Sequence, residues 1–347
     1  MTGDINMTFR VLSLFPPGLA GLLRGTAIDR CAHRRLNQVA RQAERGRDNM
    51  ANDLAVCLTF DVDGMCSWIT TMKSNNPSAL SRGEFTTVAT PRVLRLLKKY
   101  DIQATFFVPG HTACAFPDMI RQIHDAGHEI GHHSWAHENP ATLEETDERR
   151  ILERALRALE RGAGVRGPLG YRSPAWDFSK NTVKFLIELG FLYDSSCMGD
   201  DFNPYYLRTD DRWSADGPYL FGPLTSLVEL PVTWGLDDFP PFETLVGVNP
   251  GQSAPSAVEE IWYGDFEYAL NSCSGGVYTL TMHPEFIGRG HRILMLERLI
   301  NRFTAHSGVR FCTLRDYAAR WKANNPLEAW TRANKFRAGT GAITALD

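Results

Sequence analysis

Two carboxylates with a spacing suited to catalysis stand in the segment Thr59-Phe60-Asp61-Val62-Asp63-Gly64. They follow an apolar run that predicts a strand over residues 54–60. Residues two apart in an extended chain share one face, so Asp61 and Asp63 would both point into a site at the end of this strand. A plain turn is the competing interpretation, because Asp and Gly are common in turns.

Four histidines lie within the ten residues 128–137. The stretch His128-Glu129-Ile130-Gly131-His132 fits the H-E-x-x-H pattern of zinc proteases, which needs a helix to bring both histidines to one face. Here Gly127 would end the preceding helix, and the alternation of elements along the chain calls for a strand. The sequence therefore disfavours a protease site.

A second histidine pair, His133 and His137, begins where that strand would end. If the stretch makes one helical turn or a tight loop, both imidazoles can reach one ion. Asp63 would complete an Asp/His/His set with positions left open for water and substrate, as catalytic metal sites require. Surface solvation or burial as capped core imidazoles are the structural alternatives. His132 would face the other way and serve packing or a supporting hydrogen bond.

Other candidates also follow predicted strands. Arg172 could hold a carboxylate by a bidentate pair, or it could be a surface residue. His283 stands at the end of a buried-looking strand, where an imidazole could act as a general acid, although a lone histidine is usually structural. The residues that could shape an apolar substrate pocket, or could equally pack the fold, are Trp135, Pro174, Trp176 and Trp234.

The elements that must position these residues alternate between short β-rich runs and helical patterns, which predicts βα units on a parallel sheet. The predicted strands cover residues 54–60, 104–108, 128–131, 170–172, 193–195, 228–232, 277–283 and 309–312. Thr142-Leu143-Glu144-Glu145 reads as a capping box that opens a helix to about Arg161, and Ser179 can cap a helix that Gly190 ends. Seven or eight such units predict an α/β fold, a single (β/α) barrel.

Three long connections, residues 61–89, 197–226 and 235–256, are rich in Pro, Gly, Asp and Asn. In a barrel they would wall a pocket at the carboxyl ends of the strands. The barrel domain is expected over residues 50–322. Residues 323–347 show no strong periodicity and are expected to be a C-terminal tail.

The N-terminal segment, residues 1–49, has eight Arg, four acidic residues and no Lys. A targeting segment, a helical extension and upstream sequence before a true start at Met50 are the three interpretations. The apolar run from Phe9 to Leu23 is interrupted by Pro16 and Pro17, which disfavours a signal peptide. No chemistry is assigned to this segment.

The composition of the chain limits the classes of binding partner and the cellular location that we expect. The 347 residues include 37 Lys and Arg against 40 Asp and Glu, a net charge of −3, which gives no electrostatic reason to expect nucleic acid or an anionic membrane. Seven scattered cysteines without a C-x-x-C spacing predict reduced thiols in a cytoplasmic protein. No apolar run reaches the roughly 18 residues that a membrane helix requires.

Taken together, the motifs resemble those of the polysaccharide deacetylase family, carbohydrate esterase family 4, over roughly residues 54–320. Their order carries the resemblance: Thr59-Phe60-Asp61-Val62-Asp63, His133-Ser134-x-x-His137, Arg172-x-Pro174 and Leu280-x-x-His283. The sequence around these motifs most resembles the branch of intracellular peptidoglycan-deacetylase-like proteins and allantoinase-like or cyclic-imide hydrolases. This resemblance rests on Ser81-Arg82-Gly83, Pro109-Gly110-His111, His137-Glu138-Asn139-Pro140 and His283-Pro284.

The resemblance implies a distorted (β/α) barrel that hydrolyses a carbon–nitrogen bond other than a peptide bond. In it, Asp63, His133 and His137 would hold one divalent metal ion, and Asp61 would be the general base. His283 would protonate the leaving nitrogen. Arg172 would orient Asp61, and either Asp237 or Asp238 would tune His283. Zinc is the expected ion, with nickel, cobalt and manganese as alternatives.

Two departures from the family pattern bear on the substrate. Val62 separates aspartates that are adjacent in most secreted members, and the chain has no convincing export signal. Both shift the expectation toward a small cytosolic amide, such as a cyclic imide or ureide. An N-acetylglucosamine-containing glycan such as peptidoglycan is the alternative substrate, and a non-catalytic ligand-binding barrel is the alternative of another class. Relatives of this branch often assemble, so a homo-oligomer is expected by resemblance.

Overall fold

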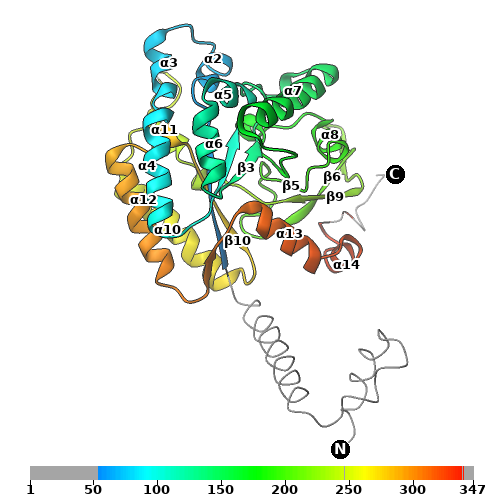
Figure 1. Cartoon of the computed structure of the whole chain (residues 1–347). Coiled ribbons are helices and arrows are strands. Elements are labelled where there is room, and N and C mark those ends of the chain that lie inside the picture. Colours follow the sequence, from blue (N-terminus) through cyan, green and yellow to red (C-terminus); the bar gives the residue numbers. More distant parts are fainter. Residues whose placement is uncertain (1–53, 246, 338, 340–347) are drawn as a thin grey trace, which may run out of the picture. The chain divides into compact units, whose positions relative to one another are not determined.

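The computed structural model describes residues 54–245, 247–337 and 339 (Figure 1). The Arg-rich segment, residues 1–49, lies outside the described residues, so its predicted alternatives stay predictions. In the part of the chain that is described, strands and helices alternate from Leu54 onward.

One curled sheet forms the centre of the fold. Eight strands follow one another in the order β10-β1-β2-β3-β4-β5-β9-β6, and β11 pairs with the first residues of β1. All printed pairings on this path are parallel except β6 with β9, which is antiparallel. The strands are β1 (Leu54–Asp61), β2 (Thr105–Val108), β3 (Glu129–His132), β4 (Gly170–Tyr171), β5 (Tyr193–Asp194), β6 (Tyr205–Arg208), β9 (Leu224–Glu229), β10 (Val277–Met282) and β11 (Val309–Phe311). The predicted distorted α/β barrel is confirmed as a half-barrel of this kind.

Helices cover the sheet on its outer side (Figure 1), with α4, α10 and α12 on one flank and α7 and α8 on the other. The helices after β1 are α2 (Cys66–Thr70), α3 (Pro77–Glu84), α4 (Thr86–Lys99), α5 (Gly110–Ala115), α6 (Pro117–Asp125), α7 (Glu145–Ala163) and α8 (Thr182–Glu188). Those after β9 are α9 (Phe239–Phe242), α10 (Pro255–Ser272), α11 (Pro284–Ile287), α12 (Gly290–Thr304), α13 (Leu314–Asn324) and α14 (Leu327–Ala333). None of the helices in the described ranges combines the length and apolar character that a bilayer crossing requires.

Burial on both faces explains why the strands could be recognised in the sequence by their apolar runs. All residues of β1 and β10 are buried, and both strands are almost continuously apolar up to their carboxyl ends. A parallel strand covered by helices on one side and by barrel contents on the other has no solvent face to mark with polar residues. Polar residues at such strand ends therefore stand out.

Three local expectations need correction. The predicted capping box at Thr142 is wrong: Asn139 caps a 3₁₀ turn, Pro140–Thr142, and the Thr142 hydroxyl donates to the Asn139 carbonyl at 2.9 Å. Helix α7 instead begins at Glu145 without a side-chain cap. The segment expected to be a tail contains α14, whose Trp330 is buried against Tyr206.

The third correction concerns the long connection 197–226, which includes strand β6 and a small hairpin of β7 (Arg212–Ser214) and β8 (Gly217–Leu220). Strand β6 is half-buried at both ends, and β7 and β8 are mostly exposed. Their sequences therefore lack the apolar runs by which the inner strands were recognised.

Candidate active site

The carboxyl ends of the parallel strands surround a pocket with an empty volume of about 720 Å³. Such strand ends are where barrel enzymes place their reacting groups, because loops from several strands converge there. The lining residues are Asp61, Asp63, Ser67, Trp68, Thr71, Met72, His133, His137, Ala175, Trp176, Trp234, Asp237, Phe239, His283 and Phe286. Residues from β1, β3, β4, β9 and β10 or their following turns thus meet in one place.

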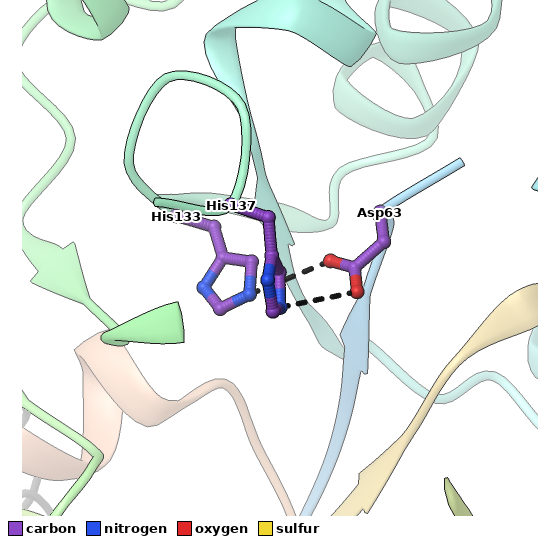
Figure 2. Close-up of side chains that lie close together, drawn as sticks. All are labelled: Asp63, His133 and His137. Atoms are coloured by element: carbon purple, nitrogen blue, oxygen red, sulfur yellow. Dashed lines mark ion pairs between the residues drawn. The ribbon is translucent and has the colours of Figure 1, made fainter. Parts of the chain in front are cut away.

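Asp63, His133 and His137 form a compact group at this pocket. The Nε2 atom of His133 lies 3.4 Å from Oδ1 of Asp63, and Nε2 of His137 lies 3.4 Å from Oδ2 (Figure 2). Both rings come from the turn after β3 and point toward the carboxylate of Asp63, which follows the end of β1 (Figure 2). One ligand-type atom from each residue lies within 4.8 Å of the others, which is the span of a single coordination sphere.

Hydrogen bonds on the far side of each ring fix which nitrogen faces Asp63. His133 donates from Nδ1 to the carbonyl of Arg172 at 2.7 Å, and Nδ1 of His137 lies 2.7 Å from the hydroxyl oxygen of Thr71. A ring that carries its proton on Nδ1 presents a lone pair at Nε2, as metal-binding histidines do. Because the Arg172 carbonyl can only accept, Nε2 of His133 is prepared as a ligand, and the contact with Thr71 orients Nε2 of His137 toward Asp63.

The turn that carries the two histidines has an unusual backbone. Ser134 and His137 adopt left-handed backbone conformations, with φ of 59° and 63°, which residues other than Gly rarely adopt. Glu138 supports the turn, because its Oε2 accepts from the amide of Ala136 at 2.8 Å and from the Ser134 hydroxyl at 3.0 Å. Such strain persists only where the surroundings enforce it, often at functional sites.

The H-E-x-x-H stretch does not form a helix, as expected. Glu129 to His132 is strand β3. Glu129 is buried and accepts from Thr105, Tyr193 and the amide of Arg315 at 2.8, 2.8 and 2.9 Å. His132 lies between the carbonyl of Leu152 and the amide of Ser134, and burial lowers its pKa to about 4. Glu129 and His132 thus have structural partners, and neither of them lines the pocket.

The Asp63 group passes a direct test for a divalent ion. Asp63 Oδ1 and His133 Nε2 are both buried and have no hydrogen-bond partner among the described residues. An unpaired buried polar atom is costly, so two that face one another fit a site that could hold a cation. One carboxylate and two imidazole nitrogens suit zinc and similar divalent metals.

Asp61 is held by a different residue. Arg172 is fully buried, and its Nη1 donates to Oδ1 of Asp61 and to the Thr59 hydroxyl at 2.9 and 2.8 Å. The same guanidinium donates from Nε and Nη2 to the carbonyl and hydroxyl of Ser195, both at 2.9 Å. The contact with Asp61 uses one oxygen, not the predicted bidentate pair. This leaves the second oxygen of Asp61 free to face the pocket.

His283 pairs with one of two neighbouring aspartates. Its Nδ1 lies 2.7 Å from Oδ1 of Asp238, and its amide donates to both oxygens of that carboxylate at 3.0 and 3.1 Å. Burial alone would lower the pKa of His283, but the bond to Asp238 and the charges of Asp237 and Asp63 raise it well above its usual value. These contacts favour the protonated form of His283, in which Nε2 is a second donor.

Asp237 has a separate position. It lines the pocket, and its Oδ1 accepts from the amide of Phe239 at 2.6 Å. Burial, opposed by the charge of His283, raises its pKa to about 7. The sequence could not separate Asp237 from Asp238, and the structure pairs Asp238 directly with His283.

Aromatic side chains form the wall opposite the polar group. Trp176 and Trp234 stack with ring centroids 4.2 Å apart and planes at 29°, and both line the pocket. Pro174 starts the 3₁₀ turn that presents Ala175 and Trp176, both with φ of 56°. Trp135 is not among the lining residues: it packs against the guanidinium of Arg154, 3.5 Å from the ring centroid.

The connection 61–89 contributes more residues to the pocket than its sequence indicated. Trp68 of α2 lines the pocket and lies under the guanidinium of Arg82, 4.3 Å from the ring centroid. Arg82 also donates to the carbonyl of Thr244 at 3.0 Å and forms an ion pair with Glu243. Arg82 therefore ties the connection 61–89 to the connection 235–256 beside the pocket. Thr71 and Trp68 carried no motif that would have singled them out.

Comparisons with known proteins show to which family the chain is similar. A sequence model described as polysaccharide deacetylase matches residues 49–193. A protein of Helicobacter pylori named peptidoglycan deacetylase is 34% identical over 292 residues, which cover 80% of this chain and 99% of that protein. A peptidoglycan deacetylase-like protein of Gibberella zeae is 29% identical over 270 residues, covering 71% and 79% of the two chains.

Solved structures extend the similarity to the fold. A protein of Mycobacterium smegmatis described as a polysaccharide deacetylase is 36% identical, with a TM-score of 0.70 over 79% of this chain and 92% of that one. The structure titled Puue allantoinase is 24% identical and has a TM-score of 0.64 over 79% and 91% of the two chains. At that identity the second likeness concerns the fold alone.

Proposed function

This chain belongs to the polysaccharide deacetylase family, and on that premise we propose that it is a metal-dependent hydrolase of an amide bond other than a peptide bond. The observation that carries the proposal is the convergence of three groups on one pocket. These are Asp61 held by Arg172, the Asp63/His133/His137 group with its unpaired atoms, and His283 backed by Asp238.

Asp63, His133 and His137 would hold the ion, zinc being the first candidate. When bound, a divalent ion polarises an amide carbonyl and lowers the pKa of a water molecule beside it. The chain's own residues would divide the proton transfers. Asp61 would accept the proton of the attacking water, and its contact with Arg172 keeps the carboxylate in one orientation.

His283 would supply the second proton. An amide nitrogen is a poor leaving group unless it is protonated, so a positioned acid is needed when the carbon–nitrogen bond breaks. The contacts that raise the pKa of His283 favour a proton on Nε2, and Asp238 holds the ring by Nδ1. Base and acid would then come from different strand ends, β1 and β10, on the two sides of the reacting carbonyl.

We further propose that the substrate is a compact amide, for which a cyclic imide or ureide is the model. The shape and lining of the pocket support this substrate class. Trp68, Trp176, Trp234 and Phe286 enclose it with apolar surface, and Arg82 joins the two bordering connections. Pockets that bury most of a small ligand have this apolar lining with a few placed polar groups.

An N-acetylated glycan is the second candidate substrate. It is favoured by the relative of Helicobacter pylori, which is named a peptidoglycan deacetylase and aligns over 99% of its length. A polymer would need a route past Trp234, which is 44% exposed at the pocket. The six described cysteines are all free, in keeping with the cytoplasmic location that we propose for the chain. A homo-oligomer stays a proposal by resemblance.

The test is a hydrolysis screen of the full chain loaded with zinc, nickel, cobalt or manganese, each with and without a chelator. The panel contains succinimide, hydantoin, allantoin and N-acetylglucosamine oligomers, and the matched control is His137→Ala. Ring opening that the chelator abolishes supports the compact-amide proposal. Acetate release from the oligomers alone would replace it by glycan deacetylation, and turnover that persists in His137→Ala would overturn metal dependence.

A further inference from the structure

Two buried carboxyl groups outside the pocket stand side by side at the carboxyl ends of β5 and β9. Asp194 and Glu229 are register partners in this parallel pair of strands. The exposed fraction of each is 0%. Two acidic side chains without exposure cannot both be ionised at close range unless something compensates their charge.

The polar contacts of the pair are unequal. Glu229 accepts through Oε1 from the amides of Ser196 and Cys197 at 3.0 and 2.9 Å, and Asp194 accepts through Oδ1 from the Ser196 hydroxyl at 2.9 Å. The other oxygens, Asp194 Oδ2 and Glu229 Oε2, have no hydrogen-bond partner within the described ranges. Carboxylate oxygens of the two residues and the Cys197 sulfur lie within 4.8 Å of one another.

We propose that Asp194 and Glu229 share one proton, and that the pair acts as a positioning unit that fixes Arg172 and, through it, Asp61. The proposal rests on the proposed function, in which Asp61 is the base. The shared proton would lie between Glu229 Oε2 and Asp194 Oδ2, the two oxygens that lack partners. Carboxyl pairs that share a proton are known from sites where two acids cannot both ionise.

The turn after β5 connects the pair to the active site. Glu229 anchors the backbone of Ser196 and Cys197, and the adjacent Ser195 accepts from Arg172 through both its carbonyl and its hydroxyl at 2.9 Å. Arg172 in turn donates to Asp61 at 2.9 Å. The Ser196 hydroxyl also accepts from the amide of Ser173 at 2.8 Å, which fixes the residue after Arg172. A shift of this turn would therefore reach Asp61 through two hydrogen bonds.

Arg172 is the cation whose charge acts on Asp194 among the groups that face the pair. The titratable and charged groups that face it are Arg172 after β4, Tyr171 in β4, Tyr205 in β6 and Cys197 in the turn. Arg172 is the one cation among these four, and its guanidinium is engaged with Asp61 and Ser195. A proton is then the simplest charge that can compensate two buried carboxylates.

The direction of the pKa shifts agrees with this arrangement. Burial first, and then the charge of Asp194, raises the pKa of Glu229 well above its usual value. Burial raises the pKa of Asp194 to about 6, against the lowering effect of its contacts with Glu229 and Ser196. Both shifts have the direction expected of two carboxyl groups that together hold a proton. If the proton left to solvent, two carboxylates would repel each other directly beneath the Ser195 turn.

The experiment compares the metal-loaded wild type with Glu229→Gln, Glu229→Leu and Asp194→Asn. Glutamine keeps an acceptor for the Ser196 and Cys197 amides and offers Asp194 a permanent N–H donor, whereas leucine removes both. Glu148→Gln is the matched control, because Glu148 is also buried and its pKa is raised, but it bonds Ser179 and Thr182 instead. Melting temperature, kcat, KM and metal content are measured from pH 4 to 9.

A group whose pKa is raised on folding favours the folded state fully below its unfolded pKa, and this contribution is lost as pH rises through the folded pKa. We therefore expect the melting temperature of the wild type to fall below that of Glu229→Gln as the pH rises above about 4.3. The difference should grow by about 2–4 °C for each pH unit until the pH reaches the pKa of folded Glu229. Glu148→Gln should show a smaller change. This readout needs no substrate, so it tests the pair even if the proposed hydrolysis fails.

Kinetics test the positioning role. We expect Glu229→Leu to lose about 10²-fold in kcat with KM and metal content unchanged, because Asp61 is no longer oriented, and Glu229→Gln to restore most of the loss. If Glu229→Leu does not fold, the pH-dependent melting of Glu229→Gln and Asp194→Asn decides. A pH-independent difference from wild type would overturn the proposal, as would a second equivalent of metal that Glu229→Gln loses.

Discussion

Nδ1 of His283 lies 2.7 Å from Oδ1 of Asp238, and the Asp238 side chain is completely buried. The same carboxylate also accepts from the backbone amide of His283, so it fixes both the ring and the main chain of that residue. A carboxylate in this position favours the protonated imidazolium and directs its other nitrogen to the pocket.

The first prediction concerns this pair. Asp238→Asn removes the charge that raises the pKa of His283, so the acid becomes deprotonated at lower pH. We expect the alkaline limb of the kcat profile to move to lower pH, and kcat at neutral pH to fall by about 10²-fold or more. Asp237→Asn is the comparison, since Asp237 affects His283 by charge without a hydrogen bond to it. An unchanged alkaline limb in Asp238→Asn would remove His283 from the role of acid.

The second prediction separates base from ligand. Asp61→Asn should lower kcat by roughly 10²- to 10⁴-fold while one equivalent of metal stays bound, because Asp61 contacts Arg172 and not the two histidines. His137→Ala should instead lower the metal content itself. Metal analysis of the purified variants, beside steady-state kinetics, checks both. Loss of metal in Asp61→Asn would contradict this division.

Metal removal gives the third prediction. An ion that binds the folded chain alone stabilises it by about 2.7 kcal/mol at a free concentration of 100 times Kd. We expect a chelator to lower the melting temperature by several degrees, at roughly 2–4 °C per kcal/mol. His137→Ala should melt at nearly the same temperature with and without the chelator. Equal chelator effects on both proteins would place the metal elsewhere.

The aromatic wall supports a fourth prediction. Trp234 stacks on Trp176 in the pocket wall and is partly exposed, so Trp234→Ala should remove apolar contact with a bound ring. We expect KM for a compact cyclic amide to rise about tenfold with little change in kcat, as for an interaction made equally in ground and transition state. Trp135→Ala serves as control, because Trp135 packs on Arg154 outside the pocket. Identical kinetics for the two variants would exclude Trp234 from substrate binding.

The parts of the fold that could be predicted are those whose burial leaves a local pattern in the sequence. The inner strands could be recognised because both faces of β1 and β10 are covered, which leaves mainly apolar runs in the sequence. Residues such as Asp61 and His283 interrupt these runs at the strand ends. The grouping of Asp63 with His133 and His137 was predicted from their positions after strand ends and from the ligand types that a catalytic metal site needs. Their roles in catalysis stay predictions.

Other features depend on contacts that no local pattern encodes. Thr71 reaches His137 across 66 residues, and the choice of Asp238 over Asp237 is decided by the direction of one turn relative to β10. Trp135, in contrast, lies in the histidine motif but packs outward, because the left-handed Ser134 turns the chain immediately before it. Sequence spacing identified the region of each residue but not the side to which its side chain points.

Arg172 has a consequence for how this site can change during evolution. Its guanidinium contacts Asp61, while its carbonyl accepts from Nδ1 of His133. Side-chain replacement can alter the first contact, but only displacement of the backbone can alter the second. The segment after β4 therefore cannot be exchanged as an independent loop, because any graft that moves it by an ångström changes base and ligand together. Diversification of substrate range would fall instead on single side chains of the pocket wall such as Trp68 and Trp234, whose replacement leaves both contacts of Arg172 in place.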